Sequence, residues 1–229
     1  MADLKKLGIY QIYFDEKSHR TCEQEWNHYN NEGKLTEFFE NTVIVDLIER
    51  QVHKPYEYFG VFSHDIRNDR VYKEDTLRFN PSTLERVVSA YDVDVFSFEK
   101  RRRNTNIITQ AENYHHGFIK IIERILEETK FLPVIPKKLD NIILFNHFIA
   151  RSEIYDQYVN ELLIPAMKIL KEMPEAYKDS NYIKRVSNEM RARFMQAFGQ
   201  PHYPYHPFIC ERLPSLFLSK YRYSCKQIF

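Results

Sequence analysis

Hydrophobic and polar residues alternate with two different periods along this chain, and their order predicts strands and helices in turn. Residues 8–14 and 56–63 are rich in β-branched and aromatic residues, which predicts two strands. Between them, apolar residues recur at helical spacing over residues 35–52. A clean alternation over residues 92–98 predicts a third strand, and the apolar run of residues 141–150 predicts a fourth.

Helices are also expected after the second and third strands, where the sequence carries two capping boxes. In a capping box, the side chain of each of two residues at a helix start accepts a hydrogen bond from the backbone N–H of the other. The boxes pair Ser82 with Glu85 and Thr109 with Glu112, and the second one opens a helix that runs to about residue 130.

Three further helices are expected toward the C-terminus. Ser152 begins the first, and Pro165 within it predicts a kink because proline removes a backbone donor. The second covers residues 181–198. The third is short: apolar positions between residues 208 and 218 fit one helical face, directly after a loop rich in tyrosine and proline.

This order of strands and helices predicts an α/β fold with a mixed sheet covered by helices on both faces. The length of 229 residues suits a single domain, residues 1–229. Ligands of such sheets bind beyond the carboxyl ends of the strands. We therefore expect four segments to lie together: residues 13–16, 63–67, 98–104 and the stretch beyond residue 148.

The amino-acid composition mainly excludes certain classes of partner and certain locations. The net charge of +1 provides no general attraction to nucleic acid or to anionic lipid, so no nucleic-acid partner is expected. Three widely spaced cysteines form neither a disulfide framework nor a zinc pattern, which favours a cytoplasmic location. No uncharged run approaches the ~20 residues of a membrane span, so any membrane contact is expected to be peripheral.

Candidate chemistry begins at the closing helix, where Glu211 and Arg212 are adjacent. A carboxylate there can accept a proton from a hydroxyl, and a guanidinium can hold a phosphate through two parallel hydrogen bonds. An ordinary buried ion pair is the alternative, with about equal weight.

Five motifs in one order connect the chain to a known family. They are Ile9–Asp15, Tyr58-Phe-Gly-Val-Phe-Ser63, Tyr91-Asp-Val with a basic run to Arg103-Asn104, Asn146-His-Phe-Ile through Tyr158, and Tyr203–Leu218 with its Glu-Arg-Leu. In these motifs, over most of its length, the chain resembles a group of bacterial glycosyltransferases from capsular and surface polysaccharide gene clusters. The resemblance implies the Rossmann-like, A-type glycosyltransferase fold.

The resemblance also implies a reaction: transfer of a sugar from a nucleotide-sugar donor to a glycan or lipid-linked acceptor, in the cytoplasm and at the inner face of the membrane. It implies that residues 1–104 hold the donor nucleotide and residues 105–229 the acceptor. Glu211 and Arg212 would be catalytic, with Glu211 as the general base if the transfer inverts the anomeric configuration. A retaining transfer, which the sequence leaves open, would need no such base. The expected donor residues are Tyr13, Asp15, Ser63, Asp92, Arg101, Arg102 and Arg103. The expected acceptor residues are Asn146, His147, Tyr203, Tyr205 and His206, with the loop 203–208 stacking on a sugar ring.

Two interpretations of the pair Asp92 and Asp94 stay open. As an Asp-x-Asp motif, it would hold Mn²⁺ or Mg²⁺ against the donor diphosphate. The pair opens its predicted strand, however, whereas the usual motif ends one, so Asp92 can equally be a cap and Asp94 a solvated residue. The basic run of residues 100–103 would then offset the phosphate charge without a metal, unless it is merely a solvated turn.

In a second hypothesis the chain has the same fold but no catalytic activity, and it serves as a glycan-binding or assembly protein. The observation that supports this hypothesis is the displaced Asp-x-Asp.

Overall fold

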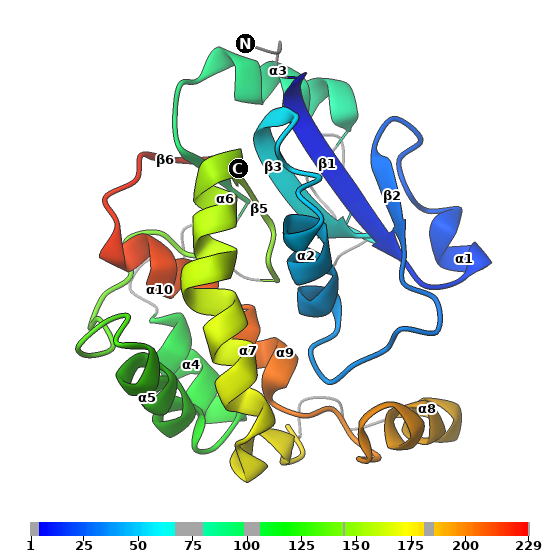
Figure 1. Ribbon diagram of the computed structural model, residues 1–229, viewed down its shortest axis with the longest axis vertical. Helices are drawn as coiled ribbons and strands as arrows, with labels where there is room; N and C mark the ends of the chain where they lie inside the picture. The colour runs from blue at the N-terminus through cyan, green and yellow to red at the C-terminus, as the bar shows by residue number, and fades with distance from the viewer. Residues whose placement is uncertain (1–4, 67–79, 99–105, 144, 181–185, 229) are drawn as a thin grey trace.

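Six strands join in one mixed sheet in the computed structural model, which describes residues 5–66, 80–98, 106–143, 145–180 and 186–228 (Figure 1). The strands are β1 (Lys5–Tyr13), β2 (Asn27–Asn30), β3 (Tyr56–Ser63), β4 (Val95–Ser97), β5 (Phe148–Arg151) and β6 (Cys225–Gln227). Their order is β2-β1-β3-β5-β4-β6. Within this sheet β5 runs antiparallel to both of its neighbours, and the other described pairs are parallel.

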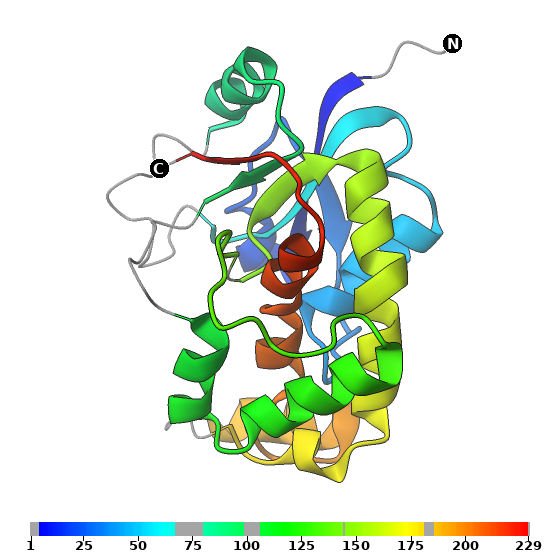
Figure 2. The same cartoon turned by 90° about the vertical axis from the view of Figure 1, so that its left-hand side faces the viewer.

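Helices surround this sheet and extend below it (Figures 1 and 2). They are α1 (Glu16–His19), α2 (Glu40–Glu49), α3 (Pro81–Ala90), α4 (Ile107–Tyr114), α5 (Phe118–Thr129), α6 (Ser152–Tyr158), the π-helical turn η2 (Val159–Leu163), α7 (Ile164–Lys171), the 3₁₀ turn η3 (Pro174–Tyr177), α8 (Asn188–Phe198), α9 (His206–Cys210) and α10 (Leu213–Lys220). The chain is thus a single α/β domain. The sequence boundary at residue 104 does not divide the sheet, because β5 and β6 come from the second half.

Alternate residues of the strands pack into two separate cores, as the period of a strand requires. On one face Phe59 and Val61 join a large cluster with α2, α5, α6, α7, α9 and α10. On the other face Tyr58 and Phe62 join a smaller cluster that includes Leu84 of α3. The predicted covering of both faces is confirmed in this form.

The strands β1 and β3 appear where the sequence predicts them, but β5 is much shorter than residues 141–150. The reason is a turn: Phe145 and Asn146 both have φ of 56°, in the left-handed region that non-glycine residues seldom adopt. Gly60 of β3 does permit a close approach, since a Cβ there would lie 3.2 Å from the carbonyl oxygen of Phe148.

Three expected helices change at their ends or break. α2 begins at Glu40, after Phe39 with φ of 53°, rather than at residue 35. The N-cap of α3 is Asn80 and that of α4 is Asn106, not Ser82 and Thr109. The helix expected over 109–130 breaks at Gly117.

Further irregularities occur next to Pro165 and within the closing motif. The π turn η2 immediately precedes α7, whose first turn contains Pro165, so the helical ladder adjusts where the missing N–H falls. The closing helix is two short helices, α9 and α10, and Glu211 and Arg212 form the junction between them. α8 begins at Asn188 rather than at residue 181, and it ends at Phe198 as predicted, with Gly199 at φ of 74° as its C-cap.

The direction of β5 corrects one expectation about the ligand edge of the sheet. Because β5 is antiparallel to β3 and β4, the residues before Phe148, not those beyond it, lie at the carboxyl ends of the parallel strands. The chain that reaches this edge is therefore the loop 145–147. Of the helices in the described part of the chain, none combines the length and hydrophobicity needed to cross a bilayer.

Candidate functional site

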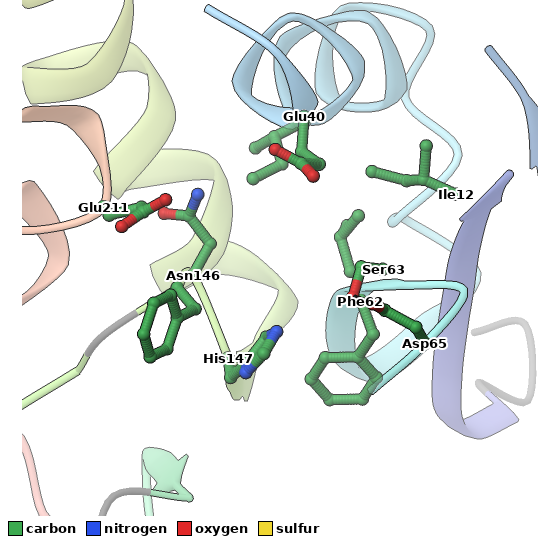
Figure 3. A pocket seen from close by; sticks show the side chains of 11 residues that line it. Ile12, Glu40, Phe62, Ser63, Asp65, Asn146, His147 and Glu211 are labelled. Carbon is green, nitrogen blue, oxygen red and sulfur yellow. Dashed lines mark hydrogen bonds between the residues drawn. The ribbon is translucent and has the colours of Figure 1, made fainter. Parts of the chain in front are cut away.

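A pocket of about 130 Å³ lies beyond the carboxyl ends of β1 and β3 (Figure 3). Its walls come from the end of the sheet, the start of α2, the loop before β5 and the junction of α9 with α10. The lining residues are Ile12, Glu40, Ile44, Val61, Phe62, Ser63, Asp65, Phe145, Asn146, His147 and Glu211. Of the residues that we expect from the sequence to form the site, the pocket brings together Ser63, Asn146, His147 and Glu211.

The end of β3 contributes a hydroxyl and a carboxylate to one wall. Ser63 is the last residue of the strand, and its Oγ donates a hydrogen bond of 2.7 Å to Oδ1 of Asp65. This bond fixes the Ser63 hydroxyl and leaves the rest of the exposed Asp65 carboxylate available to a ligand.

Asn146 is held in one orientation by a chain of side-chain hydrogen bonds. Its Nδ2 donates to Oδ1 of Asn41 at 3.0 Å, and Nδ2 of Asn41 donates to the carbonyl oxygen of Phe38, also at 3.0 Å. The backbone acceptor at Phe38 fixes the Asn41 amide, and that amide in turn fixes Asn146. Asn146 is only 5% exposed, and its Oδ1 has no hydrogen-bond partner among the described residues.

Glu40 brings a second acidic group to the pocket from the first turn of α2. The preceding Phe39 combines φ of 53° with ψ of −127°, a conformation that costs free energy for a residue with a side chain. Burial raises the pKa of the Glu40 carboxyl, and the charge of Asp65 raises it further. In Figure 3, Glu40 points into the space that Asn146, His147 and Ser63 also border.

Glu211 and Arg212 separate at the junction of α9 and α10. The Glu211 side chain is 16% exposed and lines the pocket. Nη1 of Arg212 donates to the carbonyl oxygen of Phe208 at 2.6 Å, and its guanidinium lies 5.4 Å from the centre of the Phe118 ring. The two charges still face each other at 3.7 Å, from Nη1 to Oε2. Arg212 therefore supports the helical packing, whereas Glu211 faces the pocket.

His147 is the imidazole of the pocket. It is buried between the rings of Phe62 and Phe145, at centroid distances of 6.0 and 5.8 Å. Burial lowers the pKa of His147 to about 4, against a smaller opposing effect of Asp65. The ring is thus neutral near pH 7 and adds no positive charge to the site.

Two expected donor residues lie at the same edge of the sheet but do not line the pocket. The ring of Tyr13 stacks on His19 at 4.2 Å between centroids. Asp15 is the N-cap of α1, where its Oδ1 accepts a hydrogen bond of 2.6 Å from the Ser18 backbone, and this bond lowers the pKa of Asp15. Asp15 is thus accounted for as a helix cap.

The aromatic loop before α9 corrects an expectation about acceptor binding. His206 is fully buried against Phe38 and Tyr177, and Tyr205 is 5% exposed beside His115. These side chains belong to the core of the helical region and cannot stack on a sugar there. Tyr203 is closer to the site, because its ring stacks on Phe39 at 5.4 Å and the charge of Glu40 helps to raise its pKa, which burial already raises.

The Asp-x-Asp pair lies at the opposite end of the sheet from the pocket. Arg151 forms ion pairs with Asp92 and, at 3.5 Å, with Asp94. The other oxygen of Asp94 accepts hydrogen bonds of 2.8 Å from both the backbone and the hydroxyl of Ser224. A guanidinium thus stands where a shared cation would have to bind, and this pair does not fit a metal site.

Some expected residues cannot be placed, and others line the pocket without having been expected. Arg101, Arg102 and Arg103 lie outside the described residues. The sequence did not indicate Glu40 as a pocket residue, because a helix that begins at residue 35 would place it in the middle of that helix. Asp65 could have been predicted as a site residue, because it follows a predicted strand by two residues and sheets of this kind bind ligands at strand ends.

Within the described ranges, no group of three or more histidine, cysteine, aspartate or glutamate side chains is arranged to hold a metal ion. No family model matches this chain, and neither the curated proteins nor the solved structures include a significant match to it.

Proposed function

We propose that this chain is a glycosyltransferase that moves a sugar from a nucleotide-sugar donor to a hydroxyl of a glycan or lipid-linked acceptor in bacterial surface polysaccharide synthesis. One observation carries the proposal. Ser63, Asn146, His147 and Glu211 come from three distant segments of the sequence and line a single pocket. The family resemblance implies roles in donor binding, acceptor binding and catalysis for these residues.

The A-type glycosyltransferase fold is part of this proposal. Its support is the mixed, mostly parallel sheet with helices on both faces, and the position of the pocket at the carboxyl ends of β1 and β3. Ligands of open α/β sheets bind at that edge. Arg101, Arg102 and Arg103 follow β4, whose carboxyl end lies at the same edge, so they remain candidates to hold the donor diphosphate.

In the proposed reaction Glu211 is the general base. Its carboxylate accepts the proton of the acceptor hydroxyl while the hydroxyl oxygen forms a bond to the anomeric carbon of the donor sugar. The bond from that carbon to the diphosphate oxygen breaks, and the nucleotide leaves with the electron pair. Oδ1 of Asn146 accepts a hydrogen bond from a second hydroxyl, which orients the reacting groups.

The test begins with donor binding. Melting temperatures are measured with UDP-, GDP-, CMP- and TDP-sugars, with and without Mn²⁺, and a rise specific to one donor supports the proposal. Glu211→Gln should then abolish transfer while keeping the donor-dependent rise. Glu127→Gln, on the exposed side of α5, is the matched control and should transfer as the wild type does.

The second candidate is a catalytically inactive protein that binds glycans or assembles with other proteins. The observation that favours it is the ion pairing of Asp92 and Asp94 with Arg151, since it removes the motif that would hold a metal. Glycan binding without any donor-dependent rise in melting temperature would select this candidate over the transferase.

A further inference from the structure

The loop that follows α5 presents an apolar tip to solvent. Residues 131–136 are Phe-Leu-Pro-Val-Ile-Pro, a run without a polar side chain, in a connection that is neither helix nor strand. Val134 is 70% exposed, the highest value among the large hydrophobic residues that the structure describes. Pro133 is exposed beside it, and Leu132 and Ile135 are half-buried. A single exposed apolar residue is ordinary, but a contiguous group of them indicates a contact surface.

The two ends of this loop are fixed, so its tip is held out in solvent. Phe131 is 5% exposed and its ring stacks on α10, and Leu139 at the other end is 6% exposed. Between them, Nδ2 of Asn106 donates to the carbonyl oxygen of Pro136 at 2.9 Å. In Figure 2 the loop crosses the face that is turned toward the viewer, beside α10. The exposure of Val134 is therefore a property of the fold.

Lysines surround the apolar tip. Lys130 precedes it, and Lys137 and Lys138 follow it directly. The ammonium group of Lys220, at the end of α10, lies 4.1 Å from the centre of the Phe131 ring. All four lysines are exposed. Segments that are far apart in the sequence thus place cations around one apolar surface.

Acidic side chains offset only part of this charge. Asp140 pairs with Lys138 at 2.9 Å, and Glu161 interacts electrostatically with Lys220. The other two lysines of the group have no ion pair within the described ranges. The chain as a whole is nearly neutral, with a net charge of +1, so the positive charge around the tip is local.

We infer that residues 130–138, together with Lys220, dock this protein on an anionic lipid bilayer. Pro133 and Val134 enter the headgroup region, while the lysine ammonium groups stay at the level of the lipid phosphates on their long stems. A short apolar tip alone or a few lysines alone would bind weakly, and together they give the two contributions that peripheral binding needs. The docking goes beyond the proposed function and can hold whether or not the chain transfers a sugar.

The test is co-sedimentation of the full chain with lipid vesicles. Vesicles of phosphatidylcholine alone are compared with vesicles of phosphatidylcholine and phosphatidylglycerol in equal parts. The chain should bind the anionic vesicles at least about tenfold more tightly, and added salt should weaken this binding. Val134→Asp and Lys137→Glu should each weaken it at least about fivefold. Met195→Asp and Lys54→Glu, at an exposed apolar residue and an exposed lysine elsewhere, are the matched controls and should bind as the wild type does.

A tryptophan at the tip measures insertion directly. The emission of Val134→Trp should shift to shorter wavelength when anionic vesicles are added, because the indole ring leaves water. Met195→Trp should show no such shift. The one native tryptophan, Trp26, is 8% exposed and gives a constant background.

The alternatives give different results. No binding to either kind of vesicle, or equal binding to both, contradicts the inference. Binding that Val134→Asp and Lys137→Glu leave unchanged also contradicts it, because another surface is then responsible. If ultracentrifugation shows dimers of the wild type that Val134→Asp separates, the tip is a contact between two copies of this chain and the membrane assignment is wrong. Melting temperatures equal to that of the wild type show that each variant is folded.

Discussion

Glu211 and Arg212 are adjacent in the chain, yet their side chains serve different parts of the structure. The carboxylate of Glu211 lines the pocket, while the guanidinium of Arg212 lies over the ring of Phe118 and donates to the carbonyl oxygen of Phe208. Both residues lie at the junction of α9 and α10 with right-handed helical dihedral angles, and successive residues of a helical turn point about 100° apart, so the two side chains reach different surroundings.

A substitution of Arg212 should therefore reduce stability, whereas a substitution of Glu211 should reduce activity. Arg212→Ala removes a charged hydrogen bond and a cation–π contact from a site that is 13% exposed, so it should lower the free energy of unfolding by about 2–4 kcal/mol. Glu211→Gln should change it by less than about 1 kcal/mol while transfer is lost. Urea denaturation of both variants is the measurement. A collapse of stability in Glu211→Gln would show that Glu211 is a structural member of the ion pair.

The left-handed turn before β5 predicts an unusual order of stability for glycine and alanine. Both Phe145→Gly and Phe145→Ala lose the ring contact with His147, but only alanine retains the cost of φ at 56°. Phe145→Gly should therefore be more stable than Phe145→Ala by about 1 kcal/mol. Denaturant unfolding of the two variants compares them directly, and equal stabilities would mean that this turn stores no strain.

Stability should fall as the solution becomes acidic, and buried histidines should contribute to the fall. Burial lowers the pKa of His147 and of His206 to about 4, below the 6.5 that is usual for a histidine side chain. Between these values the unfolded chain binds more protons than the folded chain, so stability is complete above pH 6.5 and is lost as the pH falls toward 4. Each histidine can account for up to about 3 kcal/mol over this window.

The variant that tests this assignment is His147→Phe, which keeps an aromatic ring between Phe62 and Phe145 and cannot titrate. Its free energy of unfolding should depend less steeply on pH between 6.5 and 4 than that of the wild type. An unchanged slope would exclude His147 as one of the responsible groups.

The Asp-x-Asp pair should matter to stability and not to donor binding. Asp94→Ala loses two hydrogen bonds from Ser224 and an ion pair with Arg151, and should cost about 1–3 kcal/mol. Asp92→Ala should cost less than about 1 kcal/mol, because the Asp92 side chain is 92% exposed. Melting curves and donor titrations of both variants test this. Loss of donor binding in Asp92→Ala would restore the Asp-x-Asp as part of the site.

Much of the sheet could be predicted from local patterns, because β1 and β3 carry the apolar and aromatic residues that a buried strand needs. β2 could not be predicted: it is a short edge strand, Asn-His-Tyr-Asn, with little to bury. The start of β5 could not be predicted either, because the left-handed turn at Phe145 and Asn146 contains no glycine that would indicate a turn. Hydrophobic periodicity reports burial, and it does not report backbone conformation.

The site was partly predictable for a related reason. Glu211 and Asn146 stand in motifs that the resemblance singles out, and both line the pocket. His206 stands in such a motif too, but its surroundings bury it completely. Glu40 stands in none, and only the tertiary fold carries the start of α2 to the ligand edge. The order of residues in a motif does not distinguish a side chain packed inward from one that faces solvent.

The reversed direction of β5 has a consequence for how this protein can diversify. The segment between α5 and β5 places Phe145, Asn146 and His147 in the pocket and then continues into β5, which pairs with β3 on one side and β4 on the other. Insertions or substitutions before β5 can change the pocket lining while the strand itself keeps its register. Homologues with new substrate preferences should therefore differ first in this incoming segment, with the sheet beneath it unaltered.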